Sequence, residues 1–163
     1  HHDLCRGGAP PCDLRGAVVY HCGPIIVRRG DGWVLRAAGP TTSIREEPYM
    51  ATLIERFGLR AIVGKGGMGE QTAEALRKHG CVYLHAVGGA AQALAANVCE
   101  VETVYGYEQF GAPEAVWQLK IRDFPALVTM DAHGGSLHSQ VREQSRRALV
   151  HSLTETRELN ATS

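Results

Sequence analysis

RAIVGKGGMGEQTAEALRKHGCVYLHAV, residues 60–87, is the segment from which the architecture of the chain can be inferred. It opens on a short apolar run, residues 60–63, that is typical of a buried strand. Residues 72–79 indicate a helix that ends at Gly80, and residues 81–87 form a second apolar run. A strand, a helix and a strand in this order predict a parallel strand pair with a crossover helix. The segment therefore indicates an α/β domain.

The residues before this segment predict a small β portion and one more helix. Residues 17–22 are rich in β-formers, and residues 25–27 and 33–35 flank a turn of Arg, Gly and Asp as the two strands of a hairpin do. Residues 48–57 place apolar side chains at i, i+3, i+4 and i+7 and end at Gly58. We expect a hairpin and then an amphipathic helix.

The residues after it predict another helix and three further strands. An Ala-rich helix is expected over residues 90–97, and strands are expected over residues 101–107, 116–121 and 126–130. The two ends differ from this body. Residues 1–12 lack periodicity and are expected to form an arm, residues 13–139 the folded domain, and residues 140–163 a helical tail.

Composition excludes several classes of protein. The chain has 163 residues, of which 44% are apolar and 21% charged, which suits one folded domain of ordinary size. Seventeen basic and seventeen acidic residues leave no net charge, which argues against a nucleic-acid partner or a polybasic membrane contact. No run of about 20 apolar residues and no leader pattern is seen, so a cytoplasmic location and no membrane partner are expected.

The five cysteines have no spacing typical of a disulfide framework or a metal site. They stand at positions 5, 12, 22, 81 and 99, an odd and dispersed set. We therefore expect reduced thiols and no metal ligand in this chain.

The first of three glycine-containing turns, Gly39-Pro40-Thr41-Thr42-Ser43-Ile44-Arg45, joins the predicted hairpin to the next helix. Its hydroxyl and amide groups fall at a helix N-terminus, where unpaired N–H groups attract anions. Arg45 adds a planar guanidinium that matches a carboxylate. The alternative is that Thr42 or Ser43 only caps the helix, the commoner use of these residues, with Arg45 in solvent.

The second turn, Gly64-Lys65-Gly66-Gly67-Met68-Gly69, lies between a strand and a helix, where open α/β sheets bind ligands. It fits G-x-G-x-x-G by spacing, but no acidic residue ends the next strand to hold a ribose, and it is not a P-loop. A cation among free backbone amides suits a small anion such as a carboxylate. The alternative is a plain strand-to-helix turn with an exposed Lys65.

The third turn, Gly88-Gly89-Ala90-Ala91, follows the second strand of the parallel pair. Parallel strands end at the same sheet edge, so this turn is expected on the same rim as Lys65, where small residues allow close backbone approach. Tight packing of the Ala-rich helix on the sheet explains the small residues equally well.

Five short segments in a fixed order carry a family resemblance: Gly39–Ser43 with Arg45, Gly64–Gly66, Val87–Ala91, Glu114–Trp117 and Asp123–Ala126. Together they resemble the β subunit, or C-terminal domain, of iron–sulfur class I fumarases and L-tartrate dehydratases. The likeness runs from about Asp13 to about Leu137. It implies that the α/β domain is a three-layer swivelling β/β/α domain.

The resemblance also implies a function. Such a chain is the β subunit or C-terminal domain of a hydro-lyase that reversibly hydrates a four-carbon dicarboxylate, fumarate to malate, or dehydrates L-tartrate to oxaloacetate. The family's [4Fe–4S] cluster is carried by an α subunit or N-terminal catalytic domain, and none is bound by this chain. Its open iron takes the departing hydroxyl as a Lewis acid. The implied assembly is an oligomer with the active site between the two parts.

Carried over residue by residue, the resemblance gives roles to particular side chains. Thr41 matches the base that removes the C3 proton, Lys65 a lysine that holds substrate near it, and Arg45 a carboxylate-binding arginine. A free threonine is a poor base, so Lys65 or a proton relay must favour the alkoxide. The candidate catalytic residues are Thr41 and Lys65, and the candidate substrate-binding residues are Thr42, Arg45, Gly66, Gly88 and Gly89.

Two other functions remain open at this stage. One is a non-catalytic module that binds a nucleotide or a phosphorylated ligand with the glycine-rich turn at residues 64–69. The other is a structural subunit that only positions its partner. The structural role predicts that Thr41→Val leaves the activity of the assembled complex unchanged.

Overall fold

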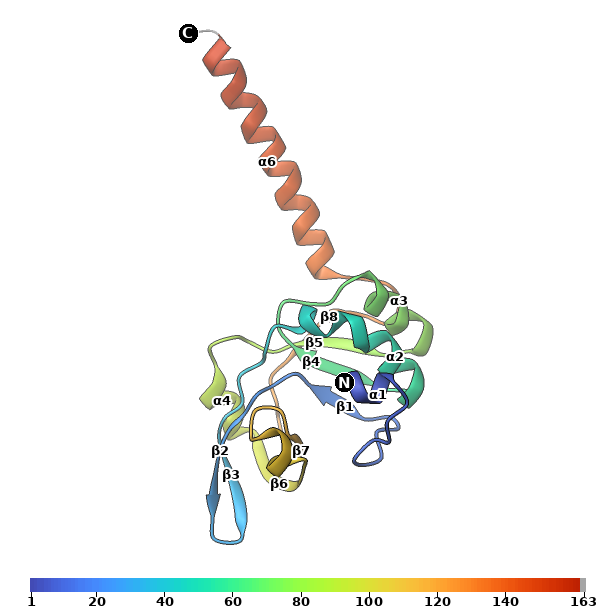
Figure 1. Cartoon of the computed structure of the whole chain (residues 1–163). Helices are drawn as coiled ribbons and strands as arrows, with labels where there is room; N and C mark the ends of the chain where they lie inside the picture. Colours follow the sequence, from blue (N-terminus) through green and yellow to red (C-terminus); the bar gives the residue numbers. More distant parts are fainter. Residues whose placement is uncertain (162–163) are drawn as a thin grey trace.

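The computed structural model describes residues 1–161 and has a four-stranded sheet at its centre (Figure 1). Three neighbouring strands are parallel and the fourth is antiparallel to its neighbour, in the order β1 (Val18–Tyr20), β4 (Ala61–Gly64), β5 (Val82–His85) and β8 (Leu127–Met130). The crossover from β4 to β5 is α3 (Glu70–His79). The predicted α/β class and the predicted parallel pair are confirmed.

One face of this sheet is covered by α2 (Glu47–Phe57) and α3. The apolar side chains predicted at helical spacing, Met50, Leu53, Ile54 and Phe57, are all buried there. They pack against residues that alternate along the strands, such as Ile62 and Tyr83. Burial of these side chains is the main force that joins the helical layer to the sheet.

On the other side of the sheet lie α4 (Ala91–Ala96) and two antiparallel hairpins, β2 (Ile25–Arg29) with β3 (Gly32–Ala37) and β6 (Val98–Tyr105) with β7 (Val116–Ile121), which extend away from the sheet (Figure 1). The second core cluster lies on this side and takes the alternate strand residues, Val63 and Leu84. The helices and the hairpins therefore lie on different sides of the central sheet. A short helix, α5 (Tyr107–Phe110), joins β6 to β7.

The N-terminal arm has more structure than its sequence predicts. It contains α1 (His2–Cys5), and the side chains of Leu4 and Cys5 pack against the helical core. The Arg56 guanidinium of α2 donates to the backbone oxygens of Leu4 and Gly8. These contacts are between residues far apart in sequence, so local periodicity does not reveal them.

The C-terminal tail is a single helix, α6 (Leu137–Ala161), which projects from the rest of the molecule (Figure 1). It starts three residues before the predicted boundary at 140, and residues 162 and 163 of the predicted tail lie outside the described residues. No helix within residues 1–161, including this one, combines the length and apolarity needed to span a membrane.

A carboxylate from α2 caps the first turn of α3. The Glu47 carboxylate accepts hydrogen bonds from the Gly69 and Thr72 amides at 2.7 and 3.1 Å, and from the Thr72 hydroxyl at 2.7 Å. These amides are among the donors that have no partner inside the helix, so the cap satisfies them and also ties α2 to α3.

We expect Glu47→Ala to lower the free energy of unfolding by about 2 kcal/mol, because it removes three hydrogen bonds to a half-buried charge. Urea unfolding followed by circular dichroism measures the change. The matched control is Glu70→Ala, at an exposed position in the same helix turn, which should change stability by less than about 0.5 kcal/mol. Equal effects of the two substitutions would contradict the capping role.

Candidate functional site

The first and second glycine-containing turns lie side by side. Thr42 and Lys65 form a parallel β-bridge. The Lys65 amide donates to the Thr41 oxygen at 3.2 Å, and the Ser43 amide donates to the Lys65 oxygen at 3.0 Å. The Thr41 amide in turn donates to the oxygen of His21, just beyond β1, at 2.8 Å. The backbone thus fixes the two threonines against Lys65.

The third turn joins the same rim. The Ala86 amide donates to the Gly64 oxygen at 2.8 Å, and a Cβ built on Gly88 would lie 3.4 Å from Lys65 Cδ. Gly88 therefore borders the aliphatic stem of Lys65, as the parallel topology predicts. Gly89 follows with a φ of +87° and has no neighbour within 4 Å of a Cβ at its position, which leaves its backbone open.

The candidate side chains are free to bind a ligand. Thr41 and Arg45 are exposed, and Thr42 and Lys65 are half-buried. Within residues 1–161, neither Arg45 nor Lys65 forms a salt bridge, and neither threonine hydroxyl has a hydrogen-bond partner. Thr42 is the N-cap of η1 (Ser43–Glu46) without a capping side-chain bond. Simple helix capping therefore does not account for the Thr-Thr pair.

Gly66 lies beside the threonines, since a Cβ at its position would be 4.0 Å from Thr42 Cγ2. Its φ is +83° and that of Gly67 is +78°, a left-handed pair that only glycine adopts without strain. The turn that follows Lys65 therefore depends on these two glycines.

Two backbone amides of this second turn, those of Met68 and Gly69, already have partners and are not free to bind an anion. The Gly69 amide is bonded to Glu47 and the Met68 amide to the Met130 sulfur at 3.4 Å. The Gly67 backbone lies close enough to the Tyr83 hydroxyl to lower the pKa of that phenol. The turn folds inward onto side chains from α2, β8 and β5, and an incoming phosphate would have to displace them. The Lys65 ammonium remains as its available anion-binding group.

A buried polar cluster, which the sequence did not predict, lies beneath the rim. The Ser43 hydroxyl is 2.8 Å from the Tyr83 hydroxyl and 3.0 Å from His21 Nδ1, and Ser43 is wholly buried. Burial lowers the pKa of His21, against the opposing effect of the Glu46 carboxylate. Burial likewise raises the pKa of the Tyr83 phenol, although its hydrogen bonds to Ser43 and Gly67 oppose this.

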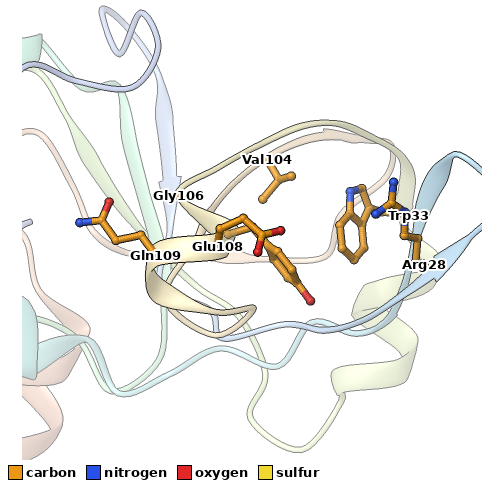
Figure 2. A pocket seen from close by; sticks show the side chains of 7 residues that line it. Arg28, Trp33, Val104, Gly106, Glu108 and Gln109 are labelled. Atoms are coloured by element: carbon orange, nitrogen blue, oxygen red, sulfur yellow. The ribbon is translucent and has the colours of Figure 1, made fainter.

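A hollow separate from the candidate site lies between the β2–β3 hairpin and the β6–α5 segment (Figure 2). Its volume is about 450 Å³, and Arg28, Trp33, Glu108 and Gln109 are among its lining residues. Trp33 packs against the ring of Tyr107 at 4.9 Å between centroids and against Trp117 at 5.2 Å. These aromatic contacts join the two hairpins. None of the candidate site residues lines this hollow.

The comparisons with known proteins agree with the sequence motifs. A family model described as Fumarase C-terminus matches residues 1–141. The chain belongs to this Fumarase C-terminus family. The resemblance inferred from five short motifs is confirmed, and the match covers every candidate site residue from Thr41 to Gly89.

Three relatives illustrate the range of the Fumarase C-terminus family. The chain is 53% identical over 140 residues to a putative class I fumarate hydratase of Geobacillus stearothermophilus, a match that covers 85% of this chain. It is 42% identical over 135 residues (82% of the chain) to a putative L(+)-tartrate dehydratase subunit beta of Methanocaldococcus jannaschii. It is 38% identical over 128 residues (78%) to the L(+)-tartrate dehydratase subunit beta of Escherichia coli.

The chain spans only part of these relatives. The matched region is 27% of the Geobacillus protein, 69% of the Methanocaldococcus subunit and 63% of the Escherichia subunit. The family match ends at residue 141, so most of α6 lies beyond it.

Proposed function

We propose that this chain is the β subunit or C-terminal domain of a hydro-lyase and supplies Thr41, Arg45 and Lys65 to a site for a four-carbon dicarboxylate. The observation that carries the proposal is the backbone bridge between Thr42 and Lys65, which brings two hydroxyls and an unpaired cation to one rim. The reaction is the reversible hydration of fumarate to malate, or the dehydration of L-tartrate to oxaloacetate.

The residues of the proposed site have different chemical roles. Arg45 and Lys65 each offer a positive charge to a carboxylate, the guanidinium as a planar fork and the ammonium as a compact charge. In this proposal Thr41 acts as its alkoxide and takes the C3 proton as the C2 hydroxyl leaves, and the Lys65 ammonium favours that alkoxide. Thr42, Gly66, Gly88 and Gly89 border the substrate and allow the backbone to approach it.

The iron–sulfur cluster of this reaction is assigned to a partner, an α subunit or N-terminal catalytic domain. Burial raises the pKa of the Cys22 and Cys81 thiols to about 11, which opposes the thiolate form that ligates iron. The residues described here contain no group of three His, Cys, Asp or Glu side chains that could hold a metal ion. Both observations support the assignment of the cluster to the partner. A cytoplasmic oligomer of both parts completes the proposal.

Assembly with the partner tests the function. The chain should be purified alone and together with a cluster-bearing α partner, and both should be assayed with fumarate, malate and L-tartrate. We expect activity only in the complex. Activity of the isolated, iron-free chain would contradict the half-site, and an inactive but cluster-loaded complex would contradict the hydro-lyase function.

Thr41→Val in the active complex separates catalysis from a purely structural role. The change keeps the shape of the side chain and removes its hydroxyl, so we expect kcat to fall by about 100-fold or more, in the range for loss of one acid–base group. Thr52→Val, at an exposed position of α2, is the control and should be silent. A silent Thr41→Val would favour the structural subunit.

The nucleotide-binding alternative has less support. The amides that a phosphate would use at the start of α3 are bonded to Glu47. We expect no heat of binding with ATP or NAD in titration calorimetry of the chain, and micromolar binding of either would revive that alternative.

A further inference from the structure

We propose that Ser43 is a positioning residue of this site, whose buried hydroxyl, held between His21 and Tyr83, sets the place of Thr41 relative to Lys65. The inference rests on the proposed function, because its consequence is the alignment of the two candidate catalytic groups. Ser43 itself is wholly buried and touches no substrate.

The Ser43 side chain contacts residues in or next to three strands, β1, β4 and β5. Its hydroxyl meets Tyr83 of β5 at 2.8 Å and His21, one residue beyond β1, at 3.0 Å. It also fills the space over the last residue of β4, since a Cβ on Gly64 would lie 1.9 Å from Ser43 Oγ. The hydroxyl is therefore enclosed by residues in or next to three neighbouring strands, Tyr83, His21 and Gly64.

The backbone of Ser43 is hydrogen-bonded to the candidate catalytic residues. The Ser43 amide donates to the Lys65 oxygen at 3.0 Å, and the Lys65 amide donates back to the Thr41 oxygen at 3.2 Å. His21 makes two contacts here. Its backbone oxygen accepts a hydrogen bond from the Thr41 amide at 2.8 Å, and its ring nitrogen Nδ1 is hydrogen-bonded to the Ser43 hydroxyl. A shift of the Ser43 backbone would therefore displace Lys65, and through it Thr41.

The Tyr83 and His21 side chains have complementary hydrogen-bonding roles at the Ser43 hydroxyl. The Tyr83 hydroxyl donates to Ser43, whose own proton is then available to a ring nitrogen. Burial lowers the pKa of His21 and so favours the neutral ring, and in the tautomer with its proton on Nε2 the Nδ1 atom accepts that proton. His21 Nε2 is buried and has no partner among the residues described.

Loss of this anchor should affect turnover more than binding. Opposite charges on substrate and rim attract over several ångströms, whereas proton transfer needs alignment, and misplacement by about 1 Å can cost about 100-fold in rate. In the assembled enzyme we expect Ser43→Ala and Tyr83→Phe each to lower kcat by about 30-fold while KM changes less than about threefold. Combining them should add little, because they remove the same bond.

The control and the rescue distinguish positioning from stability. Thr72→Val removes another wholly buried hydroxyl, one that bonds Glu47, and should lower the melting temperature while kcat stays within about twofold. His21→Asn, whose amide can take the place of Nδ1, should retain most of the kcat that His21→Leu loses. Parallel losses of stability and kcat in Ser43→Ala, Tyr83→Phe and Thr72→Val alike would overturn the positioning role.

Hydrogen exchange of the complete chain gives a second readout that needs no activity. Ser43→Ala should speed exchange of the Ser43 and Lys65 amides by about tenfold relative to other amides of the core, and Thr72→Val should not. Unchanged protection of these two amides, or a kcat within about twofold of wild type, overturns the inference. If the wild-type complex is inactive on all dicarboxylates, the proposed function fails, and the exchange result still decides whether Ser43 sets the bridge.

Discussion

Lys65→Met should lower kcat/KM of the assembled enzyme about 1,000-fold, a loss of about 4 kcal/mol of transition-state stabilisation. The ammonium is half-buried, borders Gly88, and has no salt bridge among residues 1–161. In the proposed site this ammonium has no protein counter-charge and faces the substrate carboxylates and the negative charge that develops as C3 loses its proton, so it stabilises the transition state more than it would in water. Steady-state assays in both reaction directions measure the loss.

The same substitution should leave the fold intact. Because the Lys65 side chain has no polar partner within the described chain, Lys65→Met should change the free energy of unfolding by less than about 1 kcal/mol. Lys78→Met is the matched control, because Lys78 is exposed on α3 and pairs with Glu55 at 3.0 Å. It should leave kcat/KM unchanged. A Lys65→Met variant that loses stability instead of activity would make Lys65 a structural residue.

The sequence predicts the architecture well because the elements near the site are defined by local patterns. The apolar spacing of α2 and the left-handed glycines that end α2 and α3, Gly58 and Gly80, can be recognised without tertiary information. The convergence of Lys65 and Gly88 follows from parallel topology alone, since both turns leave the same edge of the sheet. The place of Thr41 on that rim needs the family motif.

What the sequence does not predict depends on contacts between distant residues. Glu47 lies 22 residues before Gly69, and no local rule indicates that it caps α3 and occupies the amides of the glycine-rich turn. For this reason the Gly69 amide, which the sequence suggests is free for an anion, has a carboxylate partner in the structure. Ser43 also has the composition of a cap, yet its hydroxyl bonds a tyrosine 40 residues away.

Gly64→Ala should destabilise the chain by about 3 kcal/mol, a large effect for the addition of one methyl group. The φ of Gly64 is not in the left-handed region, so the requirement for glycine is one of space. The added Cβ would lie 1.9 Å from Ser43 Oγ and 3.0 Å from Tyr83 Oη, and both neighbours are wholly buried. Thermal and urea unfolding measure the loss. Gly58→Ala is not a suitable comparison because of its positive φ, whereas Gly32→Ala, with an open Cβ position, should be nearly neutral.

A second substitution, at Ser43, should relieve the clash caused by Gly64→Ala. Removing the hydroxyl from Ser43 leaves its Cβ 3.3 Å from the new methyl group, a contact that a shift of a few tenths of an ångström relieves. The double variant Gly64→Ala with Ser43→Ala should therefore be more stable than Gly64→Ala alone, although each single change is destabilising. A double-mutant cycle gives the coupling, expected at about 1 to 2 kcal/mol in the stabilising direction. Additive losses would mean that Gly64 and Ser43 do not share the space described, and that the sheet edge relaxes around an added methyl group without help from Ser43.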